Sequence, residues 1–211
     1  MKGAMRGGRN WKSASIWLLY IAALLPAGWE FCLGATDNLG ADPVKTFERF
    51  LGLWAIRFLI LTLAISPMRD VLRINFIRYR RALGLTCFYY ALMHFTVYAL
   101  LDQEISVPAI IADVVKRPFI MLGMSALVLL VPLAVTSNAI SIRRLGANWH
   151  QLHRLIYVIA ICGALHLSLA TKILSMEHWL YLALLTLSIL YTCSRSFIKR
   201  QQRANIIPAK G

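Results

Sequence analysis

The chain has 211 residues, of which 59% are hydrophobic and 15% are charged, and its mean hydropathy is +0.62. This composition excludes an ordinary soluble domain and indicates an integral membrane protein with several spans. The formal net charge is +14, but the basic residues lie in short runs between apolar segments and form no recognition motif. We therefore expect no nucleic acid partner, and we assign these residues to membrane topology and to contacts with anionic lipid.

Six segments are apolar enough and long enough to cross the roughly 30 Å hydrocarbon core of a bilayer. The first, 15–33, follows a basic start. We interpret it as a retained span rather than a cleaved secretory signal, because more spans follow and no small-x-small cleavage site stands out. The predicted fold class is an all-α integral membrane protein with a six-transmembrane-helix bundle. The other five spans are expected at 50–67, 82–101, 119–136, 149–170 and 179–194.

The distribution of charge predicts the orientation of these spans. On the side of the N-terminus, the segments 1–14, 68–81, 137–148 and 195–211 together with Arg154 hold 17 of the 23 Lys and Arg residues and one acidic residue, Asp70. The opposite side holds five basic and eight acidic residues. Because loops rich in Lys and Arg stay in the cytoplasm, we expect both termini to be cytoplasmic. The expected organisation is a cytoplasmic N-terminal tail at 1–14, a transmembrane domain at 15–194 and a cytoplasmic basic tail at 195–211.

A short helix is expected on the outer side, before the second span. Asp42 can cap this helix with Pro43 at its first position, and Phe47, Phe50 and Leu51 then share one face. We predict that the helix lies at the membrane interface and leads into the span.

Two histidines in different spans lie at matching depth. His94 precedes Asp102 by eight residues and His166 precedes Lys172 by six, so both lie roughly 9–12 Å below the outer surface. Ionisable residues in a membrane are candidates for function, although a single histidine can equally serve only to hydrogen-bond a neighbouring helix. Two imidazoles at one depth can bind opposite faces of a haem iron. We therefore predict haem b between the third and fifth spans, with His94 and His166 as its axial ligands.

His153 precedes His166 by thirteen residues, which places it about 20 Å away along the helix, near the inner surface. A second haem there would need a ligand from the third span at the level of Arg80 and Arg81, which cannot bind iron. The sequence therefore provides both axial ligands of one haem b, but only one axial ligand of a second haem. Thirteen residues also separate the two histidines by about 140° on a straight helix, so the span must bend or the histidines must face different partners. His150, one turn away, could replace His153.

Four arginines are predicted to contact anionic groups. Arg57 lies inside the second span, and two interpretations of it stay open: it binds haem propionates, or it reaches along the lipid to the outer surface. Arg80 and Arg81, with Arg78, lie where inner-leaflet phosphates, a flavin phosphate or the propionates of an inner haem would lie.

Five stretches, in order along the chain, carry a family resemblance. They are LGADPVK (39–45), RYRRALGLTCFYYALMHFTVYAL (78–100), KRPFIMLG (116–123), VTS (135–137) and RRLGANWHQLHRLIYVIAICGALH (143–166). Together, from about residue 15 to 195, they resemble the MsrQ (YedZ) family. Its members are the haem-binding membrane subunits of the bacterial MsrPQ protein-methionine-sulfoxide reductase system, within the wider ferric-reductase-like transmembrane family.

The resemblance implies a multi-pass protein of the bacterial inner membrane that holds haem b and also FMN. It implies that electrons come from the respiratory quinone pool and pass to MsrP, a periplasmic molybdopterin subunit. MsrP forms a heterodimer with the membrane subunit and reduces methionine sulfoxide in oxidised periplasmic proteins. The chain would then transfer electrons, while sulfoxide reduction occurs on its partner. The family's haem histidines correspond to His94, His153 and His166. His150 stands where the family has glutamine, so either His150 or His153 could be the inner ligand.

Ferric reductases and NADPH oxidases of the wider family carry flavin and NADPH domains after their last span. Here 17 residues follow residue 194, and the chain has no G-x-G-x-x-G motif and no P-loop. We therefore expect the electron donor to be a membrane quinol or a separate cytoplasmic flavin reductase. The alternative function is a self-standing transmembrane ferric or oxygen reductase fed by such a flavin reductase. A transporter is disfavoured, because no paired Gly- or Pro-broken helices occur in two halves.

Overall fold

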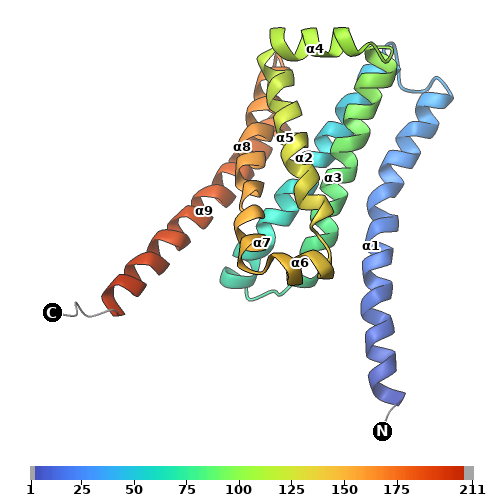
Figure 1. Ribbon diagram of the computed structural model, residues 1–211. Coiled ribbons are helices and arrows are strands. Elements are labelled where there is room, and N and C mark those ends of the chain that lie inside the picture. Colours follow the sequence, from blue (N-terminus) through green and yellow to red (C-terminus); the bar gives the residue numbers. More distant parts are fainter. Residues whose placement is uncertain (1–2, 207–211) are drawn as a thin grey trace.

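The computed structural model describes residues 3–206, and all regular elements in that range are helical (Figure 1). Six helical stretches are long and apolar enough to cross a membrane, as predicted: Ser13–Ala35, Pro43–Val71, Ile77–Asp102, Pro118–Val135, Ala147–Ala170 and Met176–Ile198. The elements in chain order are α1 (Gly3–Ala35), α2 (Pro43–Val71), η1 (Ile77–Tyr79), α3 (Arg80–Val97), η2 (Tyr98–Asp102), α4 (Val107–Lys116), α5 (Pro118–Val135), α6 (Ala139–Leu145), α7 (Ala147–Leu152), α8 (Leu155–Ala170) and α9 (Met176–Ile206).

Two helix pairs form the centre of the bundle: α2 packs along α3, and α5 packs along α8. The short helix α4 lies across one end of the bundle, and α6 and α7 lie at the other end (Figure 1). We call these the α4 end and the α6–α7 end. The start of α1 and the end of α9 both lie towards the α6–α7 end, as an even number of spans requires. Which end faces the cytoplasm stays a prediction from charge.

The innermost side chains come from the central helices and α9. Leu51, Thr86, Tyr90, Ile159 and Leu185 have almost no exposed surface. The Tyr90 hydroxyl donates a hydrogen bond of 2.7 Å to the carbonyl of Ala23, which fastens α1 to α3. The outward faces of the spans carry large apolar side chains, among them Leu61, Val128 and Leu187, as contact with lipid requires.

The start of α2 differs in one respect from the expectation. Asp42 caps the helix as predicted: its carboxylate accepts a hydrogen bond from the Lys45 amide at 3.0 Å, and Pro43 takes the first position. However, no separate interfacial helix precedes the span, because α2 continues without a break to Val71. The residues after Asp42 already point along the span, so the cap begins the membrane helix itself.

The fifth span is interrupted at His153. Helix α7 ends at Leu152, His153 forms its C-cap, and α8 begins at Leu155. The span is therefore not one continuous helix, and the break lies at the histidine nearer the α6–α7 end. This break lets the two histidines face different surroundings.

Helical structure continues into both predicted tails. Helix α1 begins at Gly3, within the predicted tail 1–14, and α9 runs on to Ile206, within the predicted tail 195–211. Residues 1–2 and 207–211 of these tails lie outside the described residues. The cytoplasmic location of the tails stays a prediction.

Candidate functional site

His94 and His166 face one another across the bundle towards its α4 end. Their imidazole ring centres lie 6.1 Å apart, and the ring planes are inclined at 75°. His94 comes from α3 and His166 from α8, so each belongs to a different central helix pair. The structure thus brings together the two histidines that the depth argument paired.

Both imidazoles are held by a backbone carbonyl. Nδ1 of His94 lies 2.8 Å from the carbonyl oxygen of Glu48 in α2, and Nδ1 of His166 lies 2.6 Å from that of Phe119 in α5. Since a carbonyl only accepts, Nδ1 of each ring carries the hydrogen and Nε2 keeps its lone pair. A carbonyl on Nδ1 is the usual way in which a metal-binding histidine is oriented.

The spacing of the two rings fits a metal ion between them. Metal–imidazole bonds of about 2.0–2.1 Å place two rings on opposite sides of a metal with their centres roughly 6 Å apart. The separation of 6.1 Å matches this value. Among the residues that the structure describes, no group of three or more His, Cys, Asp or Glu side chains could hold a metal ion. Two facing imidazoles are instead the donor set of a haem iron with two axial ligands.

A second candidate site is a cavity of about 630 Å³ near the α6–α7 end of the bundle. Its volume lies in the range of sites for cofactors and small molecules. Five arginine and histidine side chains line it, together with apolar residues from α3, α5 and α8. The five are Arg80, Arg81, His150, His153 and Arg154. The sequence placed Arg80 and Arg81 at the level of His153, and all three line this one cavity.

His153 is engaged by its neighbours in α5 and α7. The ring of Trp149 stacks on it with centres 3.9 Å apart, and the Trp149 indole donates to the carbonyl of Thr136 at 3.0 Å. Nε2 of His153 lies 3.1 Å from the Thr136 hydroxyl oxygen. That hydroxyl also donates to the Pro132 carbonyl at 2.6 Å, so it accepts from His153 and fixes the hydrogen on Nε2. Nε2 of His153 is therefore a donor in this arrangement, unlike Nε2 of His94 and His166.

Arg57 finds its partners on α9. Its guanidinium donates to Glu177 at 2.7 Å and to the Tyr181 hydroxyl at 2.6 Å, and it lies over the ring of Trp54. Tyr181 in turn donates to Glu177. These contacts compensate the charge inside the span and fasten the start of α9 to α2. Contact of Arg57 with a haem propionate would compete with this ion pair and stays a prediction.

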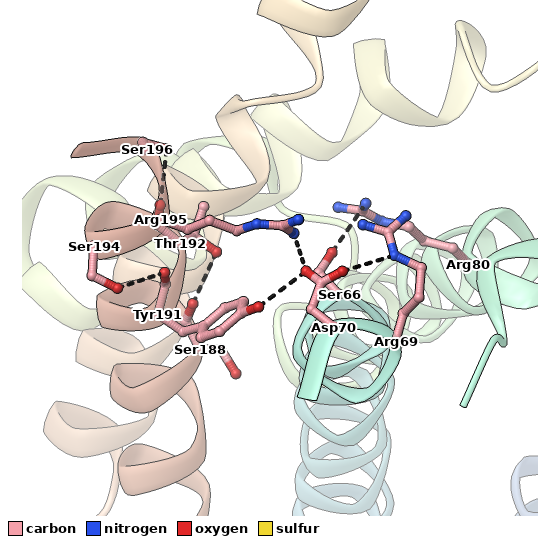
Figure 2. A network of polar contacts seen from close by, with 10 residues as sticks. All are labelled: Ser66, Arg69, Asp70, Arg80, Ser188, Tyr191, Thr192, Ser194, Arg195 and Ser196. Carbon is pink, nitrogen blue, oxygen red and sulfur yellow. Dashed lines mark hydrogen bonds and ion pairs between the residues drawn. The ribbon is translucent and has the colours of Figure 1, made fainter. Parts of the chain in front are cut away.

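A second polar network joins α2 to α9 near the α6–α7 end (Figure 2). Asp70 accepts from Arg69 at 3.0 Å, from the Tyr191 hydroxyl at 3.0 Å and from Arg195. Figure 2 also shows Arg80 reaching back to the hydroxyl of Ser66, at 3.4 Å, one turn before Asp70. The network therefore lies beside an arginine of the cavity.

Comparison with known proteins decides the family. The family described as ferric reductase like transmembrane component matches residues 51–164, which include His94 and His153 and end just before His166. The heme-binding subunit MsrQ of protein-methionine-sulfoxide reductase from Rhizobium meliloti is 54% identical over 93% of this chain and 91% of its own length. The chain belongs to the MsrQ family. MsrQ proteins of Brucella melitensis and Brucella ovis are each 53% identical over 92% of the chain and 87% of their own length. No solved structure matches the chain.

Membership of the MsrQ family agrees with the resemblance inferred from the sequence motifs. The contacts that fix the site were not predicted from the sequence, because they join residues far apart in the chain. Lys45 bridges Glu48 and Asp102 with distances of 3.3 and 2.6 Å, which fastens the start of α2 to the end of η2 next to His94. For the contacts of Asp70 and Glu177, charge was the one signal in the sequence. Asp70 is the single acidic residue on the side of the N-terminus, and Glu177 is an acidic residue on the opposite side, at the same end of the spans as Arg57.

Proposed function

We propose that this protein is the membrane electron-transfer subunit of a protein-methionine-sulfoxide reductase system. It takes electrons from the quinone pool of the bacterial inner membrane and delivers them to a periplasmic molybdopterin subunit of the MsrP type. Sulfoxide reduction takes place on that partner. The observation that carries this proposal is the facing pair His94 and His166, with ring centres 6.1 Å apart and both Nδ1 atoms on carbonyls.

In this proposal His94 and His166 hold haem b through their Nε2 atoms. Haem b, when bound, supplies one-electron transfer between a two-electron donor and the next centre. The carbonyls of Glu48 and Phe119 keep the rings in the tautomer that leaves Nε2 free. The apolar helices around the pair exclude water, and burial of this kind helps to set the reduction potential.

Electrons enter, we propose, at the cavity near the α6–α7 end. Arg80, Arg81 and Arg154 give this cavity a positive charge, which suits the phosphate of FMN, while its apolar walls suit a quinone ring. His153 donates through Nε2 to Thr136 and lines the same cavity, and we assign it to a polar contact beside the donor. One haem b then accounts for the paired histidines, and no second haem is needed.

The α4 end is the exit in this scheme. His94 lies near the end of α3 and His166 near the end of α8. Helix α4 lies across this end of the bundle (Figure 1). With the charge-based orientation, this end faces the periplasm, where the molybdopterin partner is located. His94 precedes Asp102 by eight residues and His166 precedes Lys172 by six, which supports transfer to a partner bound at this surface.

The test is quantitation of haem and flavin on the full-length protein purified in detergent, followed by reconstitution into liposomes with quinol. We expect the sharp absorption bands of reduced haem b with dithionite and one haem per chain. We also expect the haem to be reduced faster in liposomes that contain quinol than in the same liposomes without quinol. Added MsrP-type partner and oxidised protein substrate should then reoxidise the haem. Purified protein without a haem b spectrum would overturn the proposal.

The same preparation tests the alternative of a self-standing ferric or oxygen reductase. That function predicts reoxidation of the haem by ferric chelates or oxygen at the same rate with and without the molybdopterin partner. Our proposal predicts that the partner and its sulfoxide substrate accelerate reoxidation.

A further inference from the structure

Each of the two facing histidines packs directly against a glycine of the neighbouring helix. A Cβ atom added to Gly52 in α2 would lie 3.3 Å from Nδ1 and Cε1 of His94. A Cβ atom added to Gly123 in α5 would lie 2.8 Å from Nδ1 and 2.9 Å from Cε1 of His166. Both imidazoles therefore occupy space that exists only because these positions carry no side chain.

The two contacts are built in the same way. In each helix, the glycine stands four residues after the residue whose carbonyl binds the ring: Glu48 precedes Gly52, and Phe119 precedes Gly123. Residues four apart lie one above the other on a helix face. Carbonyl and glycine thus form one seat, in which the carbonyl orients Nδ1 while the bare backbone one turn on lets the ring approach.

We propose that Gly52 and Gly123 are positioning residues that set the distance and tilt of the two iron-binding imidazoles. This inference rests on the proposed ligation of haem b by His94 and His166. A methyl group at either glycine pushes the ring out of its seat, lengthens the hydrogen bond to the carbonyl and changes the separation of the Nε2 atoms. The iron then loses one ligand or binds it in a changed orientation.

The two seats leave different amounts of space for an added Cβ atom, so the two alanine substitutions should have effects of different size. Cβ contacts below 3.0 Å do not occur in folded proteins without movement, so Gly123→Ala must displace the His166 ring. At Gly52 the contact of 3.3 Å requires a shift of a few tenths of an ångström. Gly123→Ala should therefore weaken haem retention by roughly ten- to hundredfold, the range found when groups that orient metal ligands are removed. Gly52→Ala should keep the haem and change its spectrum.

Two other glycines provide matched controls. Gly163 lies in α8, the helix of His166, and an added Cβ would lie 3.2 Å from Cδ1 of Ile56, an aliphatic contact as tight as that at Gly52. Gly163→Ala therefore tests crowding of the core without contact to an imidazole. Gly28 in α1 has nothing within 4 Å of an added Cβ, so Gly28→Ala tests the gain in helix propensity alone.

The experiment compares the four alanine variants of the full-length protein with wild type, His94→Ala and His166→Ala. The readouts are haem per chain, the EPR spectrum of the oxidised protein and the haem midpoint potential. We expect Gly123→Ala to lose haem or its low-spin EPR signal, and Gly52→Ala to shift the EPR signal and the potential at near-normal haem content. Gly163→Ala and Gly28→Ala should match wild type.

The inference fails if Gly52→Ala and Gly123→Ala both retain the wild-type EPR spectrum and haem content, or if Gly163→Ala produces the same changes. If Gly123→Ala does not accumulate in membranes, Gly52→Ala alone tests the proposal: a shifted EPR signal supports it, and a wild-type EPR signal overturns it. Failure of the proposed function has a different signature: His94→Ala and His166→Ala would then retain the wild-type haem spectrum whatever the glycine variants do.

Discussion

The imidazole planes of His94 and His166 are inclined at 75°, close to perpendicular. Each ring is fixed by a carbonyl of a different helix, so this angle is set by how α2 and α5 approach α3 and α8. In a haem with two axial histidines, the angle between the imidazole planes controls the splitting of the iron orbitals.

The near-perpendicular rings predict a strongly anisotropic low-spin EPR signal for the oxidised protein. Parallel rings would give a more rhombic signal. Low-temperature EPR on the purified protein distinguishes the two, and a rhombic signal would contradict the ring arrangement described here.

Removal of either facing histidine should abolish the same haem. His94→Ala and His166→Ala each leave one ligand and are expected to lose the low-spin haem b spectrum, whereas His153→Ala should retain it, because His153 lines the cavity and is not part of the facing pair. The measurements are reduced-minus-oxidised difference spectra and haem content per chain for the three variants. Loss of two distinct haem signals in His94→Ala and His166→Ala would show that the pairing is wrong.

The cavity should affect the donor without affecting the haem. Thr136→Val removes the acceptor of the His153 hydrogen bond, and Arg81→Gln removes an exposed charge from the cavity wall. We expect both variants to slow haem reduction by quinol severalfold while haem content and EPR spectrum stay unchanged. Stopped-flow reduction in liposomes measures this, with Lys172→Gln at the opposite end as control. Unchanged reduction rates in both variants would remove the cavity from the electron path.

The ion pair of Arg57 and Glu177 should stabilise the docking of α9. The two side chains are 31% and 46% exposed, so we expect a coupling free energy of about 1 kcal/mol or less, measured by a double-mutant cycle of Arg57→Gln and Glu177→Gln. Thermal unfolding in detergent provides the measurement. Additive effects of the two substitutions would show that the pair contributes nothing to stability.

Asp70 should hold the other end of α9. Asp70→Asn leaves Arg69 and Arg195 without a counter-charge, although the side chain can still accept from Tyr191 (Figure 2). We expect faster hydrogen exchange in α9 around Tyr191, with the spans α3 and α5 unaffected. Glu30→Gln in α1 is the control for loss of one negative charge, and equal exchange in both variants would contradict the role of Asp70.

Much of the fold followed from the sequence, since hydrophobic length alone determines how many helices cross a bilayer. The pairing of His94 with His166 also followed, because depth in a membrane is a simple function of distance from a charged loop. The contacts of Arg57 and Asp70 did not follow. Their partners on α9 lie 120 or more residues away, and helix neighbours that are not consecutive in sequence leave no local signal.

The cavity shows the same limit. The sequence placed Arg80 and Arg81 at the level of His153, but the hydrogen bond from His153 to Thr136 depends on how α5 meets the break between α7 and α8. That packing also decides which nitrogen of His153 carries the hydrogen. Counting residues gives heights along a helix; it does not give the rotation of one helix against another.

The position of α9 at the end of the chain has a consequence for biosynthesis. Arg57 enters the membrane 120 residues before its partner Glu177 is made, which at about 5–20 residues per second is a delay of roughly 6 to 24 s. During this interval the nascent chain carries an uncompensated guanidinium inside a span, and Asp70 has Arg69 as a partner but lacks Tyr191 and Arg195. A chain released by the ribosome before α9 is complete would keep Arg57 without its counter-charge, which exposes an unpaired cation within the membrane to proteases that survey unassembled helices.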